Sequence, residues 1–307
     1  MNRSRSTAIA TALLLAALAI AGCGFGAGAD VGKVKLTVTR DFGAVPMLER
    51  SLEVKESDTV MRLLEGSADI STRYGGGYVE AIEGVEERER GGHPHAWFFF
   101  VDGVESPIGA ADYAVNGRER VWWDYRDWSA TNRVPAVVGS WPAPFVAGYE
   151  GNRRPVAVEC MGGGESCGLV REALRGLGTL ITSDPPESAI RVLVGPWSRL
   201  RSDPAAVQLE AGPEVSGVFG GFDLQEDGYA LIGLDQFGEA AAGFGPDAGL
   251  VAATRRYEAP PVWMVTGGTA AGVREATRLL DAAKLRNHYA VVSEDGEETA
   301  LPVADAP

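Results

Sequence analysis

The stretch Trp97-Phe98-Phe99-Phe100-Val101-Asp102-Gly103 decides how the first part of this chain folds. It contains the most apolar of the predicted strands. Successive side chains of a strand point to opposite sides of a sheet, so the odd-numbered residues share one face and the even-numbered residues share the other. One face fills the core of the domain. The other face packs against a second domain, forms an exposed binding surface or is plain surface.

The residues before this stretch have the alternation of strands and the spacing of one short helix. Apolar residues alternate with polar ones in the strands, and they recur at i, i+3 and i+4 in the helix. Serine and aspartate are common helix N-caps. The predicted elements are strands at 33–39, 48–54 and 75–82, a helix from the caps Ser57 and Asp58 to about Gly66, and a charged loop at 83–92.

This region carries several motifs of one known family. The aromatic stretch resembles the signature W-x-aromatic-aromatic-V-N/D-G of the domain at the C-terminus of transcobalamins, which also occurs in many bacterial surface proteins. The resemblance covers about residues 33–128 and implies a β-grasp-like fold, a mixed sheet that clasps one short helix. The turn at 116–121 departs from the family pattern, although Glu119 can take the acidic role. The supporting motifs follow in the order of the family: 58–64 resembles its helix start, 74–82 its segment y-x-x-G-x-Y-V-x-x-I, and 111–115 and 121–125 its closing strands.

The resemblance also implies a ligand, and the transcobalamins suggest a corrinoid. A glycan or a protein partner, such as an envelope or transport protein, is the alternative, because similar domains occur in adhesive surface proteins. We expect Trp97 in the core, and one of Trp122 and Trp123 exposed or at an interface, because neighbouring strand residues point to opposite faces. The candidate ligand-binding residues are Trp97, Phe99, Asp102, Tyr113, Trp122, Trp123 and Tyr125.

The second half of the chain follows a different pattern. Residues 129–152 contain three prolines and several glycines and are predicted to be a connector. Residues 153–300 are predicted to be an α/β domain, for which we identify no family. Strand–glycine–helix units at 155–177 and 261–283 share the sequence Val-Arg-Glu-Ala, as a pseudo-repeat or as two βα units. Further expectations are strands at 190–194, 229–232 and 289–292, the last of the domain, and a tail at 301–307. The predicted fold class is α+β, with an N-terminal β-grasp-like domain followed by a small α/β domain.

The N-terminus predicts a lipoprotein. Residues 1–22 combine a short basic segment with an apolar run that is too short to span a bilayer comfortably. The sequence Ile20-Ala21-Gly22-Cys23 resembles a bacterial lipobox, in which the cysteine thiol receives a diacylglycerol. We expect the mature protein to begin at Cys23, to continue as an acylated flexible linker over 23–32, and to be lipid-anchored on the extracytoplasmic face of the cell membrane.

Charge excludes one class of partner. The chain has 28 Lys and Arg residues against 42 Asp and Glu residues, a formal net charge of −14. Such an acidic surface repels phosphate backbones, so we expect no binding of nucleic acid. Anionic lipid would repel it as well, so the acyl chains must provide the anchoring.

Two further cysteines, Cys160 and Cys167, flank a glycine-rich segment. In an oxidising compartment they are expected to form a disulfide. A metal-binding pair is the alternative, but no third or fourth ligand lies near them in the sequence.

A serine hydrolase is the catalytic alternative. Gly164-Glu165-Ser166-Cys167-Gly168 matches G-x-S-x-G between a strand and a helix, and His288 follows in the order of an α/β-hydrolase. Several features disfavour it: Cys167 is better explained by the disulfide, three residues separate the strand from the motif, and His288 precedes a predicted strand. His93 and His95 are weak candidates for a metal site or for an axial ligand of a corrin. The favoured function is a non-enzymatic binding protein without a cofactor of its own, and a structural envelope protein is the third alternative.

Overall fold

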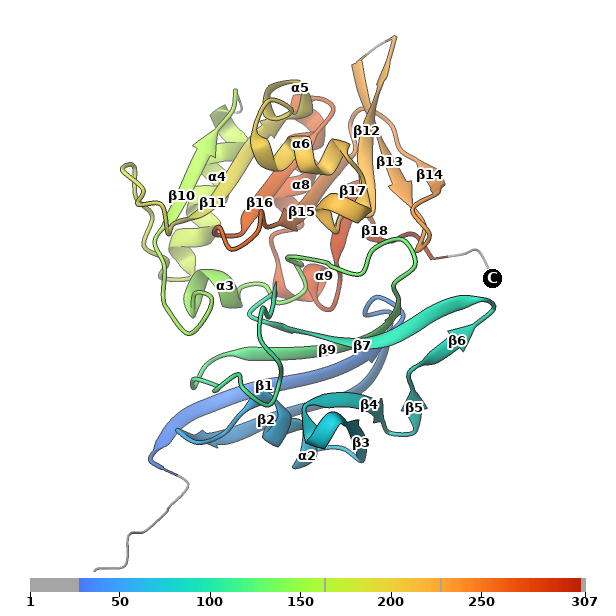
Figure 1. The fold of residues 1–307 in the computed structure, drawn as a ribbon. Helices are drawn as coiled ribbons and strands as arrows, with labels where there is room; N and C mark the ends of the chain where they lie inside the picture. The colour runs from blue at the N-terminus through green and yellow to red at the C-terminus, as the bar shows by residue number, and fades with distance from the viewer. Residues whose placement is uncertain (1–27, 163, 227, 305–307) are drawn as a thin grey trace, which may run out of the picture.

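The computed structural model describes residues 28–162, 164–226 and 228–304. They form two domains, each built on its own large sheet, which lie one above the other in Figure 1. The expected signal peptide (1–22) and Cys23 lie outside the described residues. None of the helices in the described part of the chain combines the length and the apolar character needed to cross a membrane. The chain is a mixture of helices and strands, as predicted.

The first domain is built on a mixed sheet in which β1 and β9 run parallel at the centre, while the other pairs are antiparallel. The parallel central pair and the short helix that the sheet clasps give the β-grasp-like arrangement. The sheet order is β2 (Val45–Lys55), β1 (Asp30–Arg40), β9 (Arg120–Asp127), β7 (His93–Val101) and β6 (Arg88–Arg90), and β8 (Val104–Glu105) also pairs with β7.

The short helix α2 (Val60–Glu65) forms where the apolar spacing predicts it, but its cap is different. The side chain of Thr59 accepts a hydrogen bond from Arg62 N, so Thr59 is the N-cap in place of Ser57 or Asp58. The carboxylate of Asp58 accepts from Lys55 N instead, which closes the preceding turn. Gly66 is the C-cap, as expected.

Two expectations for the irregular segments of this domain were wrong. The charged segment 83–92 is not a loop throughout, because β5 (Val85–Glu86) and β6 lie in it and pair with β4 (Tyr78–Ile82) and β7. Residues 111–115 form no strand and contribute a single bridge, from Ala114 to Thr59. The first domain also contains a small antiparallel sheet. It comprises β3 (Ile70–Arg73), β4 (Tyr78–Ile82) and β5 (Val85–Glu86), and η1 (Tyr74–Gly76) forms the turn between β3 and β4.

The second domain is built on a six-stranded sheet. Its order is β10 (Val156–Cys160), β11 (Ile190–Pro196), β16 (Val262–Gly267), β15 (Gly249–Thr254), β17 (Ala290–Glu294) and β18 (Glu297–Leu301). The first three strands are parallel, as two βα units require, and β15 is antiparallel to both of its neighbours. A separate three-stranded sheet comprises β12 (Gly220–Gln225), β13 (Gly228–Leu234) and β14 (Ala240–Gly243).

Both faces of the six-stranded sheet are buried. On one face the sheet packs against α4 (Gly164–Gly176), α8 (Ala270–Arg278) and α3 (Ala143–Val146). On the other face it packs against α5 (Trp197–Leu200), α6 (Pro204–Glu210) and aromatic side chains of the first domain. Two further short helices belong to the domain, α7 (Pro213–Ser216) and α9 (Ala282–Leu285).

Several boundaries differ from those expected. The predicted helix 270–283 is interrupted, because Asp281 caps a new helix by accepting hydrogen bonds from Ala283 N and Lys284 N. Strand β17 is not the last, since β18 follows it and includes Leu301, the first residue of the expected tail. Strand β1 begins at Asp30, inside the expected linker.

The segment 129–152 is packed against the second domain rather than loosely connecting the two domains. Val134 and Val137 belong to the buried cluster that includes Trp122, whereas Trp141 and Phe145 pack on the opposite face of the second sheet. The segment therefore passes from one face of the second sheet to the other and contributes to the buried cluster on each face.

The two domains share a continuous apolar interface. Phe42, Phe100 and Trp122 of the first domain pack in one cluster with Tyr289 and other residues of the second. The backbones approach so closely that a Cβ at Gly43, where φ is +86°, would lie 1.7 Å from Asn287 O. Only glycine fits there, because it has no Cβ and adopts a positive φ readily.

Candidate ligand-binding site

Strands β7 and β9 bring the predicted aromatic residues together. Their register places Trp97 opposite Tyr125 and Phe99 opposite Trp123, with ring centroids 5.2 and 4.9 Å apart. Trp97 is 5% exposed and lies in the core, as expected. This face of the sheet is therefore a layer of aromatic rings beneath α2 and β4.

A groove of 250 Å³ opens beside this layer. We call it the aromatic groove. Trp97, Phe99 and Trp123, three of the seven predicted ligand-binding residues, line it together with residues of α2, β4 and β8. Its polar side chains are those of Tyr78, Glu105 and Ser106, and its apolar ones include Met61, Val79, Trp97, Phe99, Ala110 and Trp123.

The indole of Trp123 is distinguished from the other two indoles on these strands by its hydrogen bonding. Trp97 Nε1 donates to Val85 O at 3.0 Å, and Trp122 Nε1 donates to Thr39 Oγ1 at 2.8 Å. Trp123 Nε1 is buried and has no acceptor among the described residues. A buried donor without a partner costs about 1–3 kcal/mol, so an acceptor supplied by a ligand would recover that energy.

Glu105 adds a titratable carboxyl to the groove. Its Oε2 accepts a hydrogen bond from Val134 N at 2.8 Å. Burial raises the pKa of Glu105 to about 7, against weaker opposing effects of Arg126 and that hydrogen bond. Burial likewise raises the pKa of Tyr78 to about 12, so its hydroxyl stays protonated at neutral pH. The groove thus combines a titratable carboxyl and a phenol with apolar rings.

The sequence identified Trp97, Phe99 and Trp123 as lining residues but missed Phe98 and three polar residues, Tyr78, Glu105 and Ser106. Tyr78 lies inside the motif at 74–82, so this motif could have identified it as a candidate. Glu105 lies in the two-residue strand β8 and had no such signal, because only the pairing of β8 with β7 brings it to the groove.

The other four predicted residues do not line the groove. Tyr125 is buried beneath it and donates to Glu86 O at 2.7 Å. Asp102 Oδ1 accepts from Arg120 N at 2.9 Å, and burial raises the pKa of this carboxyl. Tyr113 donates to Glu119 Oε1 at 3.4 Å. These last contacts hold the loops at one end of the sheet, where Glu119 also accepts from Asn116 N.

Trp122 is the fourth predicted residue that does not line the groove, because it lies on the opposite face of β9. It is 2% exposed and packs against Phe100 and Tyr289 in the domain interface. The expectation that one of Trp122 and Trp123 lies at an interface is therefore confirmed. Phe98, on the same face, lies under the guanidinium of Arg126 at 3.9 Å from the ring centroid.

His93 and His95, the weak candidates for a metal site, lie at the start of β7. His93 packs on Phe237 with ring centroids 4.4 Å apart, and its Nδ1 is 3.8 Å from Asp127 Oδ2. His95 stacks on Tyr125. Among the described residues, no three His, Cys, Asp or Glu side chains gather closely enough to hold a metal ion.

The geometry contradicts the hydrolase arrangement. Ser166 is 5% exposed and lies within α4, not on a strained turn between strand and helix. It follows the carboxyl end of β10, whereas His288 precedes the amino end of β17, which runs in the same direction. The carboxyl ends and the amino ends of strands of this length lie roughly 17 Å apart. Ser166 and His288 therefore cannot form a catalytic pair.

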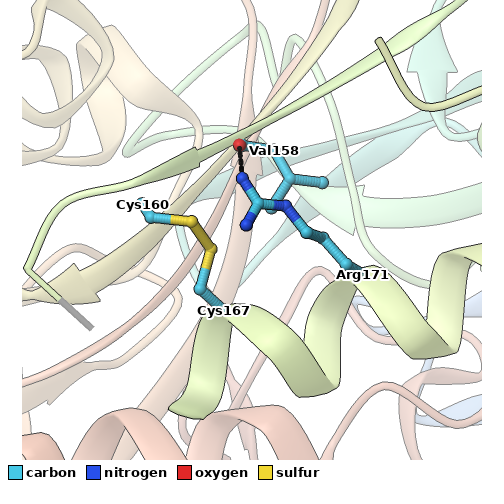
Figure 2. The surroundings of a disulfide bond; sticks show 4 residues. All are labelled: Val158, Cys160, Cys167 and Arg171. Atoms are coloured by element: carbon cyan, nitrogen blue, oxygen red, sulfur yellow. Dashed lines mark hydrogen bonds between the residues drawn. A yellow bond between two sulfur atoms is a disulfide. The ribbon is translucent and has the colours of Figure 1, made fainter. Parts of the chain in front are cut away.

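Cys160 and Cys167 form a disulfide, as predicted, with their Cα atoms 5.8 Å apart. Figure 2 shows that it ties the end of β10 to the first turns of α4, next to Arg171, which donates to Val158 O at 3.2 Å. The disulfide thus links the strand to the helix, which is a structural role.

Comparisons with known proteins give a family match in the first domain. Residues 57–127 match the family described as a domain of unknown function, DUF4430. They lie within the segment 33–128 that resembles the transcobalamin domain. Among solved structures, the chain is similar to a protein from Ruminococcus gnavus ATCC 29149 described as a "putative metal binding protein", with 12% sequence identity, a TM-score of 0.24, and coverage of 31% of this chain and 97% of that chain. The search of curated proteins found no match.

Proposed function

We propose that this protein is a non-enzymatic binding protein that captures a small molecule in the aromatic groove. The observation that carries the proposal is an apolar groove whose lining includes Trp123, the residue whose buried indole N–H has no acceptor among the described residues. Binding pockets combine apolar walls with a few polar groups that fix the orientation of the ligand. The ligand should therefore have a flat apolar part and a carbonyl or similar acceptor.

The volume of the groove limits how the ligand is held. At 250 Å³ it is smaller than the roughly 300–1,000 Å³ that encloses a complete drug-sized molecule. It suits one group of a larger ligand, such as an amide side chain or a ring edge. A corrinoid carries amide groups around a flat ring, so the ligand suggested by the resemblance is the first one to test.

Calorimetric titration of the purified protein with cyanocobalamin and hydroxocobalamin tests this proposal. Saturable binding in the micromolar range is expected. Replacing Trp123 by Phe removes the N–H and should weaken binding about tenfold, the value of one hydrogen bond. The matched control is Trp122→Phe, which removes an indole N–H on the opposite face of β9 and should leave the affinity nearly unchanged.

A titration with benzamide tests whether the groove binds ligands at all, independently of whether the ligand is a corrinoid. It has a flat ring and a carbonyl acceptor, and NMR detects weak binding. If no corrinoid binds but benzamide shifts the Trp123 indole signal, the groove is a binding site and only the proposal of a corrinoid ligand is wrong. If neither binds, or if Trp122→Phe and Trp123→Phe weaken binding equally, the proposal that the groove is a binding site is wrong.

We also propose that an acylated Cys23 anchors the protein outside the cytoplasmic membrane. The support is the lipobox-like sequence and the apolar run before it. In a bacterial host the full chain should be recovered with membranes, and Cys23→Ala should release it from them. Equal membrane recovery of both proteins would contradict the anchor.

A structural envelope protein is the second candidate. It is supported by the burial of Phe100 and Trp122 between the domains, which removes the outer aromatic face as a binding surface. It would be favoured if the aromatic groove bound neither the corrinoids nor benzamide.

A further inference from the structure

A second hollow, of 580 Å³, lies between the two domains. The first domain contributes Asp41 and Phe42 from the turn between β1 and β2 and His95 from β7. The second domain contributes His288 and residues of β18, including Glu298. We call it the interdomain cleft. Its volume lies within the usual range for a site that encloses a small ligand, and domain interfaces are common places for such sites.

The two imidazoles of the cleft have spare hydrogen-bonding capacity. His95 Nδ1 lies 3.0 Å from His93 O, and because a carbonyl oxygen only accepts, Nδ1 carries the proton. His95 Nε2 in the neutral ring is therefore an acceptor. His288 Nδ1 is buried and has no partner among the described residues, and burial lowers the pKa of this ring, which keeps it neutral at neutral pH.

The charged groups of the cleft are acidic. Its lining contains the carboxylates of Asp41 and Glu298 and no lysine or arginine. Glu298 pairs with Lys284, whose Nζ is 2.6 Å away, outside the lining. The carboxylate of Asp41 is exposed and has no hydrogen bond or ion pair within residues 28–162, 164–226 and 228–304. One unpaired negative charge thus faces an acceptor-rich hollow with apolar walls at Phe42 and Val303.

We propose that the interdomain cleft binds a small organic cation whose N–H groups donate to Asp41 and to the imidazoles, and whose apolar body packs against Phe42. A cation satisfies the unpaired carboxylate, while its N–H donors match the acceptors. This site is separate from the aromatic groove, and the proposal stands whether or not the groove binds a ligand.

Three probes of similar shape test the charge preference: tryptamine, a cation; tryptophol, which is neutral; and indole-3-acetate, an anion. The chain contains three histidines, so their ring signals in NMR spectra can be assigned from His→Gln variants. Tryptamine at millimolar concentration should shift the signals of His95 and His288 saturably. Tryptophol should bind at least fivefold more weakly, and indole-3-acetate should not bind.

Asp41→Asn should weaken tryptamine binding about fivefold, the value of one partly exposed ion pair, and should leave tryptophol binding unchanged. Asparagine also tolerates the positive φ of +57° at this position. The control Glu297→Gln, next to Glu298 on β18 but outside the cleft lining, should change neither affinity. Trp123→Phe should also leave tryptamine binding intact, which separates this site from the groove.

Three results would overturn the proposal: equal affinity for the three probes, no shift of His95 and His288 with tryptamine, or an unchanged affinity in Asp41→Asn. Stoichiometric shifts of both histidines with zinc chloride, without any shift by tryptamine, would identify a metal site instead and would also overturn it.

Discussion

Asp124 links the two domains through a buried carboxyl, and its titration should set part of the pH dependence of stability. The side chain is fully buried. It accepts hydrogen bonds from Thr39 Oγ1, from Gly43 N at 3.1 Å and, across the interface, from Tyr289 OH at 2.9 Å. Burial outweighs these hydrogen bonds and raises the pKa of Asp124 from an ordinary value of 3.8 to about 6.

The sign of the effect follows from where the proton is held more tightly. Because the pKa of Asp124 is higher in the folded protein, the folded state binds the proton more strongly than the unfolded chain does. The carboxyl therefore imposes no penalty below the unfolded pKa, and stability is lost as the pH rises through the folded pKa. A rise of roughly two pKa units corresponds to about 3 kcal/mol of unfolding free energy lost between about pH 4 and about pH 8.

The variant Asp124→Asn removes this titration and keeps the shape of the side chain. Its amide oxygen can accept from Thr39 and Gly43, and its amide group can donate to the oxygen of Tyr289. Glu105, whose pKa burial raises to about 7, titrates in the same direction in both proteins and cancels in the difference. The stability of the variant relative to the native chain should therefore rise by about 3 kcal/mol from about pH 4 to about pH 8.

Urea unfolding followed by tryptophan fluorescence at a series of pH values measures this difference. Asp69→Asn, which replaces an exposed carboxylate without a side-chain hydrogen bond to another described residue, is the control and should show a nearly constant difference. If the difference for Asp124→Asn stayed constant across the same pH range, the carboxyl would not titrate as its burial implies, and the reasoning would be refuted.

Two further predictions concern stability. Trp97→Ala should lower the free energy of unfolding by about 3–5 kcal/mol, because it removes a buried ring from the core of the first domain. The control Trp128→Ala, at a residue that is 36% exposed, should lower it much less. Similar melting temperatures for the two variants would contradict this placement of Trp97. Replacing both Cys160 and Cys167 by Ser should lower the free energy of unfolding in urea by about 2 kcal/mol, because the disulfide closes only a short loop; an unchanged midpoint under non-reducing conditions would count against a stabilising role.

The local features of the fold could be predicted because residues close in sequence determine them. Strict alternation identified β1, the continuous apolar stretch identified β7, and apolar spacing identified α2. Where prediction failed locally, competing side-chain contacts decided the outcome. Asp58 closes a turn, so that Thr59 becomes the cap, and Asp281 starts a new helix inside the predicted one.

By itself, the sequence determined that the rings of β7 and β9 divide between two faces and that Cys160 and Cys167 lie within bridging distance, because alternation and short loops are set by the backbone alone. Only the tertiary structure decided which face meets the second domain and which indole is left without an acceptor. Asp124 and Tyr289, which meet across the interface, are 165 positions apart in the sequence. Contacts of this kind depend on strand register and domain packing, which no local pattern encodes.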